Sequence, residues 1–367
     1  MTVQKQLGFW LAAFAGAIFF LYLFADILLP FVAALALAYL LDPLADRLER
    51  LGVSRLGATL LILLLFVLVF VVVLVVVLPL VVREITAFLA LLPSYVLRLQ
   101  ELVIDRGAPF LEYLGVETTG QELQRSIGEM VQGGAGYLVT LIGTLVASGQ
   151  TLVSVFSLLV LTPVIAFYLL IDWDRLVATV DGWLPLRHRP TIRRLAREMD
   201  EVLSRFVRGQ ATICLILGAF YAVTLALVGL NFGALIGMTA GLLSVIPYVG
   251  TLTGLILSVG VAIVQFWPDF AWVLVVLGIF LFGQFVEGYF LQPKLLGGAV
   301  GIHPVWLMFA LFAFGSLLGF VGLLLAVPLA AMVGVLARFG LSRYLESSFY
   351  DGGVVGAERR AREDEHG

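Results

Sequence analysis

Residues 56–82 form an apolar run of 27 residues without a single charged side chain. An α-helix rises about 1.5 Å per residue and needs about 20 apolar residues to cross the hydrocarbon core of a bilayer. The run therefore predicts a transmembrane helix. Other apolar runs occur at 7–25, 27–41, 150–171, 209–230, 233–249, 251–267, 270–291 and 304–338.

The composition of the whole chain is that of a multi-pass integral membrane protein. Hydrophobic residues make up 61% and charged residues 13%, with a mean hydropathy of +1.08. Soluble domains carry about 25% charged residues. The first run is expected to stay as a span, because it is too long for a cleaved signal peptide and leads directly into a second run. We predict an all-α integral membrane fold with about eight transmembrane helical segments and an extracytoplasmic helical segment.

The arginines predict the topology. Segment 172–208 contains eight arginines, whereas the longer segment 83–149 contains four arginines and seven acidic residues. The positive-inside rule places 172–208, linker 42–55 and both termini in the cytoplasm. The predicted regions are the N-terminal transmembrane scaffold 1–82, the extracytoplasmic helical segment 83–149, the transmembrane helix 150–171, the cytoplasmic amphipathic segment 172–208, the C-terminal transmembrane transport region 209–342 and the cytoplasmic, disordered tail 343–367.

Two aqueous segments have helical apolar periodicity. In the outer segment Pro93 is expected to kink the helix or to start a new one, and 107–120 is expected to be a loop. The apolar positions are Ile85, Phe88, Leu92, Tyr95, Leu99 and Leu102 in the outer segment and Leu195, Met199, Val202 and Phe206 in the cytoplasmic one.

Glycines and prolines interrupt the later apolar runs. Runs 233–249 and 251–267 are short for full spans, so they predict either two thin spans or one hairpin entering from outside. Run 304–338 would extend roughly 50 Å as a straight helix, which predicts a hairpin entering from inside or a pair of tilted spans. Discontinuous helices of this kind form the binding sites of secondary transporters. The candidate breaks are Pro163, Pro247, Gly250, Gly315, Gly319, Gly322 and Pro328.

Glu287 is the main candidate for a functional residue. It lies toward one end of the predicted span 270–291, where ionisable groups are costly and usually face a pathway or a partner. Removal from water favours the neutral form of a carboxyl group, so Glu287 is expected to exchange protons near neutral pH or to ligate a cation. Gln284, three residues earlier, shares its helical face and is expected to bond it or a polar substrate. The alternative is a carboxylate that serves helix packing alone.

Four further residues are candidates for a gate or an interface. Asp172 and Asp174 flank Trp173 at the predicted cytoplasmic end of run 150–171. Lys294 is expected at the cytoplasmic end of the Glu287 helix, where reaching the lipid headgroups is the simpler explanation. His303 precedes Pro304 and could titrate near neutrality, although a structural role is favoured.

The sequence does not favour an enzyme. It has no HExxH motif, no P-loop and no Gly-x-Gly-x-x-Gly in a suitable context. The histidines His188, His303 and His366 lie in separate segments, so neither a metal site nor a cofactor is expected, and nothing aligns Ser316 with His303 for proteolysis. One cysteine, Cys214, excludes an intramolecular disulfide. Without an ATP-binding motif, active transport would depend on an ion or solute gradient.

Several segments together resemble the autoinducer-2 exporter family of bacterial permeases. They are PVIAFYLLIDWDRL at 163–176, IPYVG at 246–250, QFVEGYFLQPKLLGGAVGIHP at 284–304 and FGSLLGFVGLLLAVPLAA at 314–331. The resemblance implies an inner-membrane protein of about eight spans that forms homo-oligomers, with pentamers described. Family members are associated with autoinducer-2 export or with sodium/proton antiport. Thr251 departs from the family, in which proline commonly follows IPYVG.

We therefore expect a secondary transporter that moves a small polar solute across the bacterial inner membrane by alternating access, coupled to ions through Glu287. A sodium/proton antiporter, an oligomeric channel and a structural membrane protein organised by segment 83–149 remain alternatives. The expected partners are a small-molecule or ion substrate, the lipid bilayer and further copies of the chain, but no nucleic acid.

Overall fold

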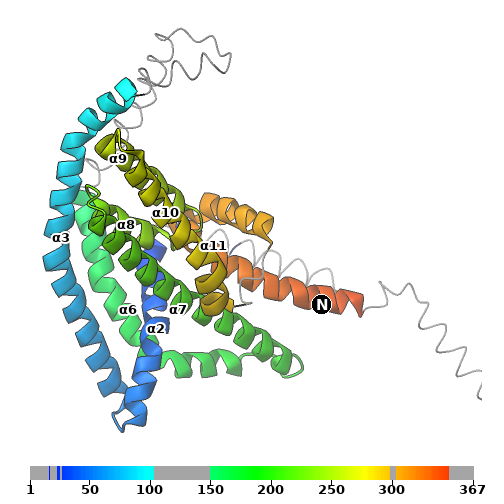
Figure 1. The fold of residues 1–367 in the computed structure, drawn as a ribbon. Coiled ribbons are helices and arrows are strands. Elements are labelled where there is room, and N and C mark those ends of the chain that lie inside the picture. Colours follow the sequence, from blue (N-terminus) through cyan, green and yellow to red (C-terminus); the bar gives the residue numbers. More distant parts are fainter. Residues whose placement is uncertain (1–15, 17–22, 25–26, 103–148, 298–302, 347–367) are drawn as a thin grey trace, which may run out of the picture. The chain divides into compact units, whose positions relative to one another are not determined.

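The described part of the protein is entirely helical. The computed structural model describes residues 27–102, 149–297 and 303–346, together with 16, 23 and 24. These residues contain no β-strand, and six of their helices are long and apolar enough to cross a membrane. The elements in Figure 1 are α2 (Leu28–Arg50), α3 (Arg55–Leu102), α6 (Gly149–Gly182), α7 (Arg189–Leu227), α8 (Gly233–Leu243), α9 (Val249–Phe266), α10 (Phe270–Val286), the π-helix η3 (Glu287–Leu296) and α11 (Pro304–Leu345).

The chain divides into two compact units, each considered by itself. One unit contains 29–171 and 209–295, and the other contains 172–208 and the residues from 296 onward. In the first unit α2, α3 and α6 share one apolar core, in which small residues of α2 let the helices approach closely. The buried core residues are Ala34, Leu37, Ala38, Leu41, Ala45, Ile62, Leu63, Ala166 and Leu170.

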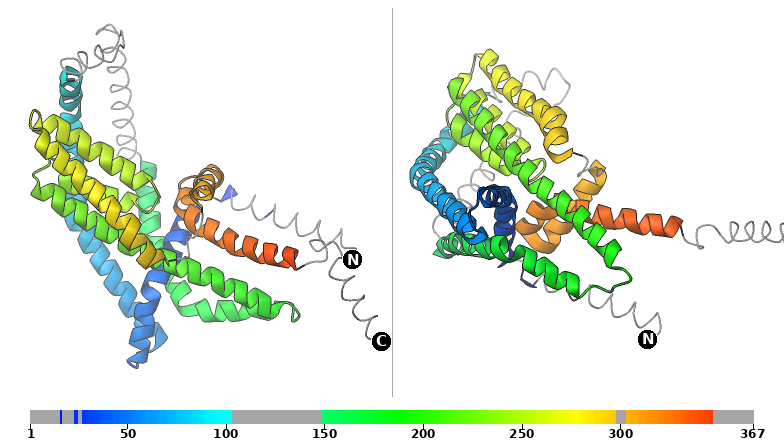
Figure 2. Two further views of the ribbon diagram at one scale, coloured as in Figure 1. Left: turned by 45° about the vertical axis from the view of Figure 1, so that its right-hand side comes forward. Right: turned by 90° about the horizontal axis from the view of Figure 1, so that it is seen from below.

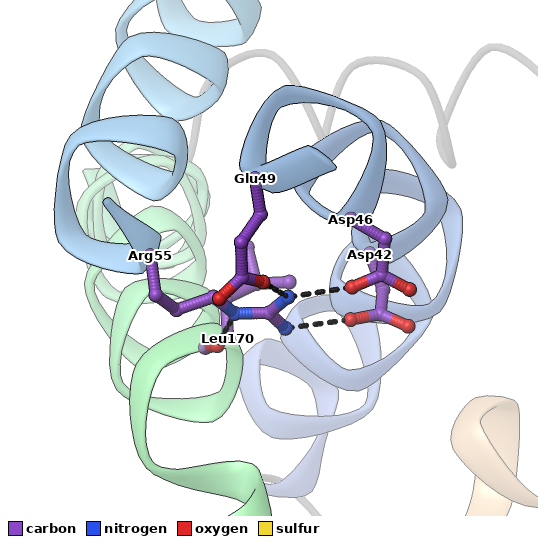
Figure 3. A network of polar contacts seen from close by, with 5 residues as sticks. All are labelled: Asp42, Asp46, Glu49, Arg55 and Leu170. Atoms are coloured by element: carbon purple, nitrogen blue, oxygen red, sulfur yellow. Dashed lines mark hydrogen bonds and ion pairs between the residues drawn. The ribbon is translucent and has the colours of Figure 1, made fainter. Parts of the chain in front are cut away.

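Arg55 ties the same three helices together at the start of α3 (Figure 3). Its guanidinium donates to Asp42 Oδ1 at 2.8 Å, to Asp46 Oδ1 at 2.6 Å and more weakly to Glu49 Oε2 at 3.4 Å. Its Nε donates to the Leu170 carbonyl of α6 at 3.1 Å. The three carboxylates are spaced four and three residues apart, so they lie on one face of α2. The planar fork of arginine suits this arrangement, which a point charge could not satisfy.

Glycines set the distance between α7 and α8. A Cβ atom on Gly237 would lie 2.2 Å from the Ala222 nitrogen, and one on Gly241 would lie 2.2 Å from the Gly218 Cα. Gly233 meets the backbone of α7 in the same way, at Leu225. Glycines repeated every four residues form one face of α8 against α7, which is how helices approach most closely in membranes.

The helix pair α8–α9 is held by a second set of close contacts. A Cβ on Gly254 of α9 would lie 2.6 Å from the Ala240 side chain and 2.7 Å from the Phe280 ring of α10. A Cβ on Gly250 would lie 2.4 Å from the Ser244 nitrogen at the end of α8. Figure 2 shows α8, α9 and α10 side by side. With 11 residues, α8 is too short to cross the hydrocarbon core alone.

The far part of α3 is anchored to the loop between α7 and α8. Tyr95 Oη accepts a hydrogen bond from the Asn231 side chain at 3.1 Å, and Phe88 contacts Phe232 edge to face. The backbone N–H of Asn231 also donates to Gln265 at the end of α9, at 2.7 Å. These contacts fix the outer helical stripe that the sequence predicts around Phe88 and Tyr95.

In the second unit, α11 folds back on itself at Gly319. Gly319 has φ 59° and ψ −135°, a conformation available mainly to glycine. A Cβ on Gly322 would lie 1.8 Å from the Phe314 carbonyl oxygen. Residues eight positions apart in a straight helix are about 12 Å apart along the axis, so this contact requires a reversal. The predicted division of run 304–338 occurs at the middle of its three glycines.

The same unit contains a helical hairpin closed by ion pairs. Arg193 Nε at the start of α7 donates to Asp181 Oδ1 at 2.6 Å, and Arg189 also pairs with Asp181. These hydrogen bonds lower the pKa of the Asp181 carboxyl group. The turn 183–188 lies between the two helices.

Several helices continue past their expected ends. The predicted linker 42–55 is largely helical, because α2 runs to Arg50 and only 51–54 separate it from α3. Helix α3 continues past 82 and through position 93, so no new helix starts at Pro93. Helix α6 ends at Gly182 instead of 171. Hydropathy marks where the apolar sequence ends, whereas backbone hydrogen bonding continues into polar sequence. The expected loop 107–120 lies outside the described residues.

Two of the prolines considered as kinks or breaks lie inside continuous helices. Helix α6 continues through Pro163 and α11 continues through the buried Pro328. A proline removes one backbone donor, and helices in a packed membrane environment tolerate this loss. Pro247, in contrast, lies in the turn before α9, as expected.

Replacing Arg55 should destabilise the fold more than replacing an ordinary surface arginine. Arg55→Ala leaves three carboxylates facing one another, so we expect the free energy of unfolding to fall by about 1–2 kcal/mol. Arg55→Lys should recover part of this, because it keeps the charge without the fork. The control is Arg194→Ala, whose exposed side chain lies 3.7 Å from Glu198. The measurement is thermal denaturation of the detergent-solubilised chain. Equal losses of stability in Arg55→Ala and Arg194→Ala would contradict the role of Arg55 in joining the three helices.

Adding one methyl group at Gly237 should separate α7 from α8. We expect Gly237→Ala to lower the melting temperature, because its Cβ would overlap the α7 backbone. The matched control is Gly260→Ala in α9, where a Cβ meets no atom within 4 Å. Alanine is favoured over glycine in a helix by about 0.5–1 kcal/mol, so the control should melt at the same or a higher temperature. The opposite order of melting temperatures would show that the contact is not needed.

Candidate functional site

Glu287 is a buried carboxylate held by two neutral amides. It is 8% exposed and follows the last residue of α10. Its Oε2 accepts a hydrogen bond from Gln284 Nε2 at 2.9 Å, and its Oε1 accepts one from Gln292 Nε2 at 3.2 Å. Both hydrogen bonds that it receives from described side chains come from glutamines, not from lysine or arginine. The carboxylate is thus oriented without its charge being neutralised by an ion pair.

The helix changes its register at this carboxylate. Glu287 is the first residue of η3, in which hydrogen bonds run from residue i to residue i+5. In an α-helix Gln292 would lie about 140° around the axis from Glu287. The wider π-helical turn brings residues five apart together, which allows Gln292 to reach Glu287. Short π-helical segments within α-helices are frequent at functional sites.

Helix α7 supplies the facing groups. Tyr221 is 2% exposed and stacks on Phe280 of α10, with ring centroids 4.4 Å apart and planes 8° apart. Gly283 makes room for this ring, since a Cβ there would lie 2.3 Å from Tyr221 Oη. Both Tyr221 and Cys214 lie within electrostatic range of Glu287.

Gln210 extends this polar face of α7 to the broken end of α8. It is 8% exposed and donates through Nε2 to the Ser244 carbonyl at 2.7 Å. Ser244 Oγ donates in turn to the Ala240 carbonyl at 2.8 Å. The end of α8 would otherwise expose unpaired carbonyls in an apolar region, so Gln210 stabilises the break between α8 and α9.

These residues form a polar cluster in an apolar helix bundle, in which Gln210, Tyr221 and Glu287 are buried and Gln292 is exposed. Within the described residues, no group of three or more His, Cys, Asp or Glu side chains could hold a metal ion. A single oriented carboxylate with nearby hydroxyl and amide groups can exchange a proton, bind a cation loosely or accept a hydrogen bond from a polar solute. The cluster comprises Gln210, Cys214, Tyr221, Gln284, Glu287 and Gln292.

The remaining predicted candidates do not join this cluster. Asp172 and Asp174 are exposed on α6, and Lys294 is exposed on η3. His303 caps α11, where its Nδ1 accepts from the Val305 N–H at 3.3 Å. Gly250 supports the close approach of α8 and α9, and the glycines of α11 surround its reversal. Their assignment to a gate or an interface stays a prediction.

The sequence pattern predicts some residues of this cluster but not all of them. The spacing of three residues between Gln284 and Glu287 predicts their proximity. Gln210, Cys214 and Tyr221 repeat at four and seven residues, a helical periodicity that could have indicated a polar face on α7. No helical spacing in the sequence indicates Gln292, because the α-helical period places it on another face of the helix than Glu287.

The chain is similar to known bacterial transport proteins along most of its length. The sequence profile of the AI-2E family transporters matches residues 7–341. PerM of Escherichia coli, which is named as a permease, is 30% identical over 88% of this chain and 89% of its own length. YrrI of Bacillus subtilis, named as a transport protein, is 27% identical over 84% of this chain and 85% of its own. The AI-2 transport protein TqsA of E. coli is 26% identical over 85% of each chain.

The Asp181 ion pairs should give a pH-dependent contribution to stability. The carboxyl pKa is lowered in the folded state, so the contribution is complete above the unfolded pKa of about 3.9 and is lost as pH falls toward the folded value. We expect Asp181→Asn to melt a few degrees below the wild type at neutral pH. The difference should stay constant down to about pH 5 and shrink below about pH 4. If the difference in melting temperature between the wild type and Asp181→Asn widened in acid, the stabilising role of the Asp181 ion pairs would be contradicted.

Proposed function

Since this chain belongs to the AI-2E family of transporters, we propose that it is a secondary transporter that moves a small polar solute across the bacterial inner membrane by alternating access. Transport is coupled to a cation, a proton or sodium, through Glu287. The family is one of bacterial permeases, which fits a multi-pass membrane protein.

The buried carboxylate of Glu287, which forms no ion pair with any described side chain, carries the proposal. A carboxylate is expensive inside a membrane protein, and it is kept where it serves a pathway or a partner. A glutamine at 287 would form similar amide contacts without that cost. The change of helical register at the same residue also supports the proposal, because short π-helical segments are frequent at functional sites.

Discontinuous helices supply the elements that move in this proposal. The α8–α9 pair contains a helix too short to span, and α11 reverses at Gly319. Broken helices are tolerated in membranes where they line protein or a water-filled cavity, and in secondary transporters they surround the substrate near the midplane. We assign the α8–α9 pair and α10, which belong to one unit, to the transport pathway, and we infer a moving role for α11 within its own unit. The arginines of 172–208 favour a cytoplasmic location for that segment and for both termini.

The proposal extends to the identity of the transported species. The relative TqsA is named for AI-2 transport, which makes autoinducer-2 the first solute to test. A sodium/proton antiporter is the second candidate. The single oriented carboxylate favours this candidate. A proton and a sodium ion can compete for it, so exchange of the two needs no organic solute.

Purified protein in liposomes tests both candidates. Autoinducer-2 is added to one side and proton movement is followed for the wild type, Glu287→Gln and the control Glu198→Gln. Glu198 is an exposed carboxylate in α7. We expect solute-dependent proton flux in the wild type and the control. Glu287→Gln should fall to the level of empty liposomes, because an amide cannot carry the proton.

Each other outcome has a defined meaning. Proton flux that needs only sodium supports the antiporter. Conductance that neither saturates nor depends on Glu287 supports a channel. Full coupled transport by Glu287→Gln would overturn the coupling role and leave Glu287 as a packing residue.

A further inference from the structure

Tyr221 carries a buried hydroxyl group that lacks a hydrogen-bond partner among the described residues. Its ring is fixed between Phe280, on which it stacks, and the open face of Gly283. The side chain is 2% exposed, so bulk water does not satisfy the hydroxyl in this conformation. The Gln284 amide lies near it without meeting hydrogen-bond geometry.

A phenylalanine would fill the same space without this cost. Burying a hydroxyl without a partner disfavours the folded state, and the stacking on Phe280 uses only the ring. Gln284 Nε2 donates one hydrogen bond to Glu287, and none from Gln284 to the Tyr221 hydroxyl meets hydrogen-bond geometry. The hydroxyl therefore contributes nothing to the packing that the ring does not already provide.

The position of the hydroxyl allows it to bind a polar group beside Glu287. It belongs to the polar face of α7 and points at Gly283, one residue before Gln284 and four residues before Glu287. A polar atom that entered beside Glu287 would find one fixed hydroxyl, able to donate or to accept, and one oriented carboxylate. Recognition by buried polar groups that are unpaired until the substrate binds gives strong discrimination.

We propose that the Tyr221 hydroxyl binds the transported solute directly, through a hydroxyl or carbonyl group of that solute, and so sets affinity beside the coupling residue Glu287. This inference rests on the proposed function. Tyr221 recognises the solute, whereas Glu287 carries the coupled cation, so the two residues affect different kinetic quantities.

Tyr221→Phe tests the inference, because it removes only the hydroxyl and keeps the stacked ring. The matched control is Tyr168→Phe, the same change at an exposed position of α6. Initial rates of transport in liposomes are measured against autoinducer-2 concentration at fixed sodium, and against sodium at fixed autoinducer-2. We expect the KM for autoinducer-2 to rise about three- to tenfold in Tyr221→Phe. The maximal rate and the sodium dependence should stay unchanged, and Tyr168→Phe should match the wild type.

An unchanged KM for autoinducer-2, or a change in the sodium dependence alone, would overturn the inference. Melting temperature gives an independent check. Tyr221→Phe should be at least as stable as the wild type, and a clear loss of stability would show that the hydroxyl has a partner within the protein. If Glu287→Gln abolishes flux while Tyr221→Phe keeps its KM, the inference fails and the proposed function stands. If the wild type moves no autoinducer-2, the proposal for this solute fails and the inference fails with it.

Discussion

The close approach of α7, α8, α9 and α10 at their glycines determines the geometry of the candidate site. Three glycines spaced four apart let α8 lie against the backbone of α7, and Gly254 lets α9 reach both α8 and α10. Gly283 then admits the Tyr221 ring between α7 and α10. Side chains at these positions would overlap the neighbouring helices and push them apart. The polar face of α7 would then no longer lie beside Glu287.

A carboxylate inside this bundle must be oriented without being neutralised. Two glutamines do this from the same helix, one through α-helical spacing and one through the π-helical turn. Amides stabilise a carboxylate less strongly than an arginine would, which is what the proposed exchange of a proton or cation at Glu287 requires. Arg55 shows the contrasting case, because its guanidinium meets three carboxylates and its role is to join helices.

The sequence was sufficient to predict the helical membrane fold, the contact between Gln284 and Glu287 and the division of the last apolar run. These features depend on composition, on α-helical spacing and on glycine, all of which act locally. The ends of α2, α3 and α6 could not be predicted, because their last turns are polar and hydropathy does not detect them. Gln292 could not be assigned either, since its contact requires a change of helical register. Helices α6 and α11 continue through Pro163 and Pro328, because neighbouring helices can compensate for one missing backbone donor.

The central claim is that the Glu287 carboxyl group changes its protonation or its cation when the solute binds. Infrared difference spectroscopy of the reconstituted protein measures this most directly, by recording the carboxyl signal before and after autoinducer-2 is added. The account predicts a solute-induced change in a carboxyl band that is present in the wild type and absent from Glu287→Gln. A spectrum without such a change, recorded while the same protein transports the solute, would contradict it.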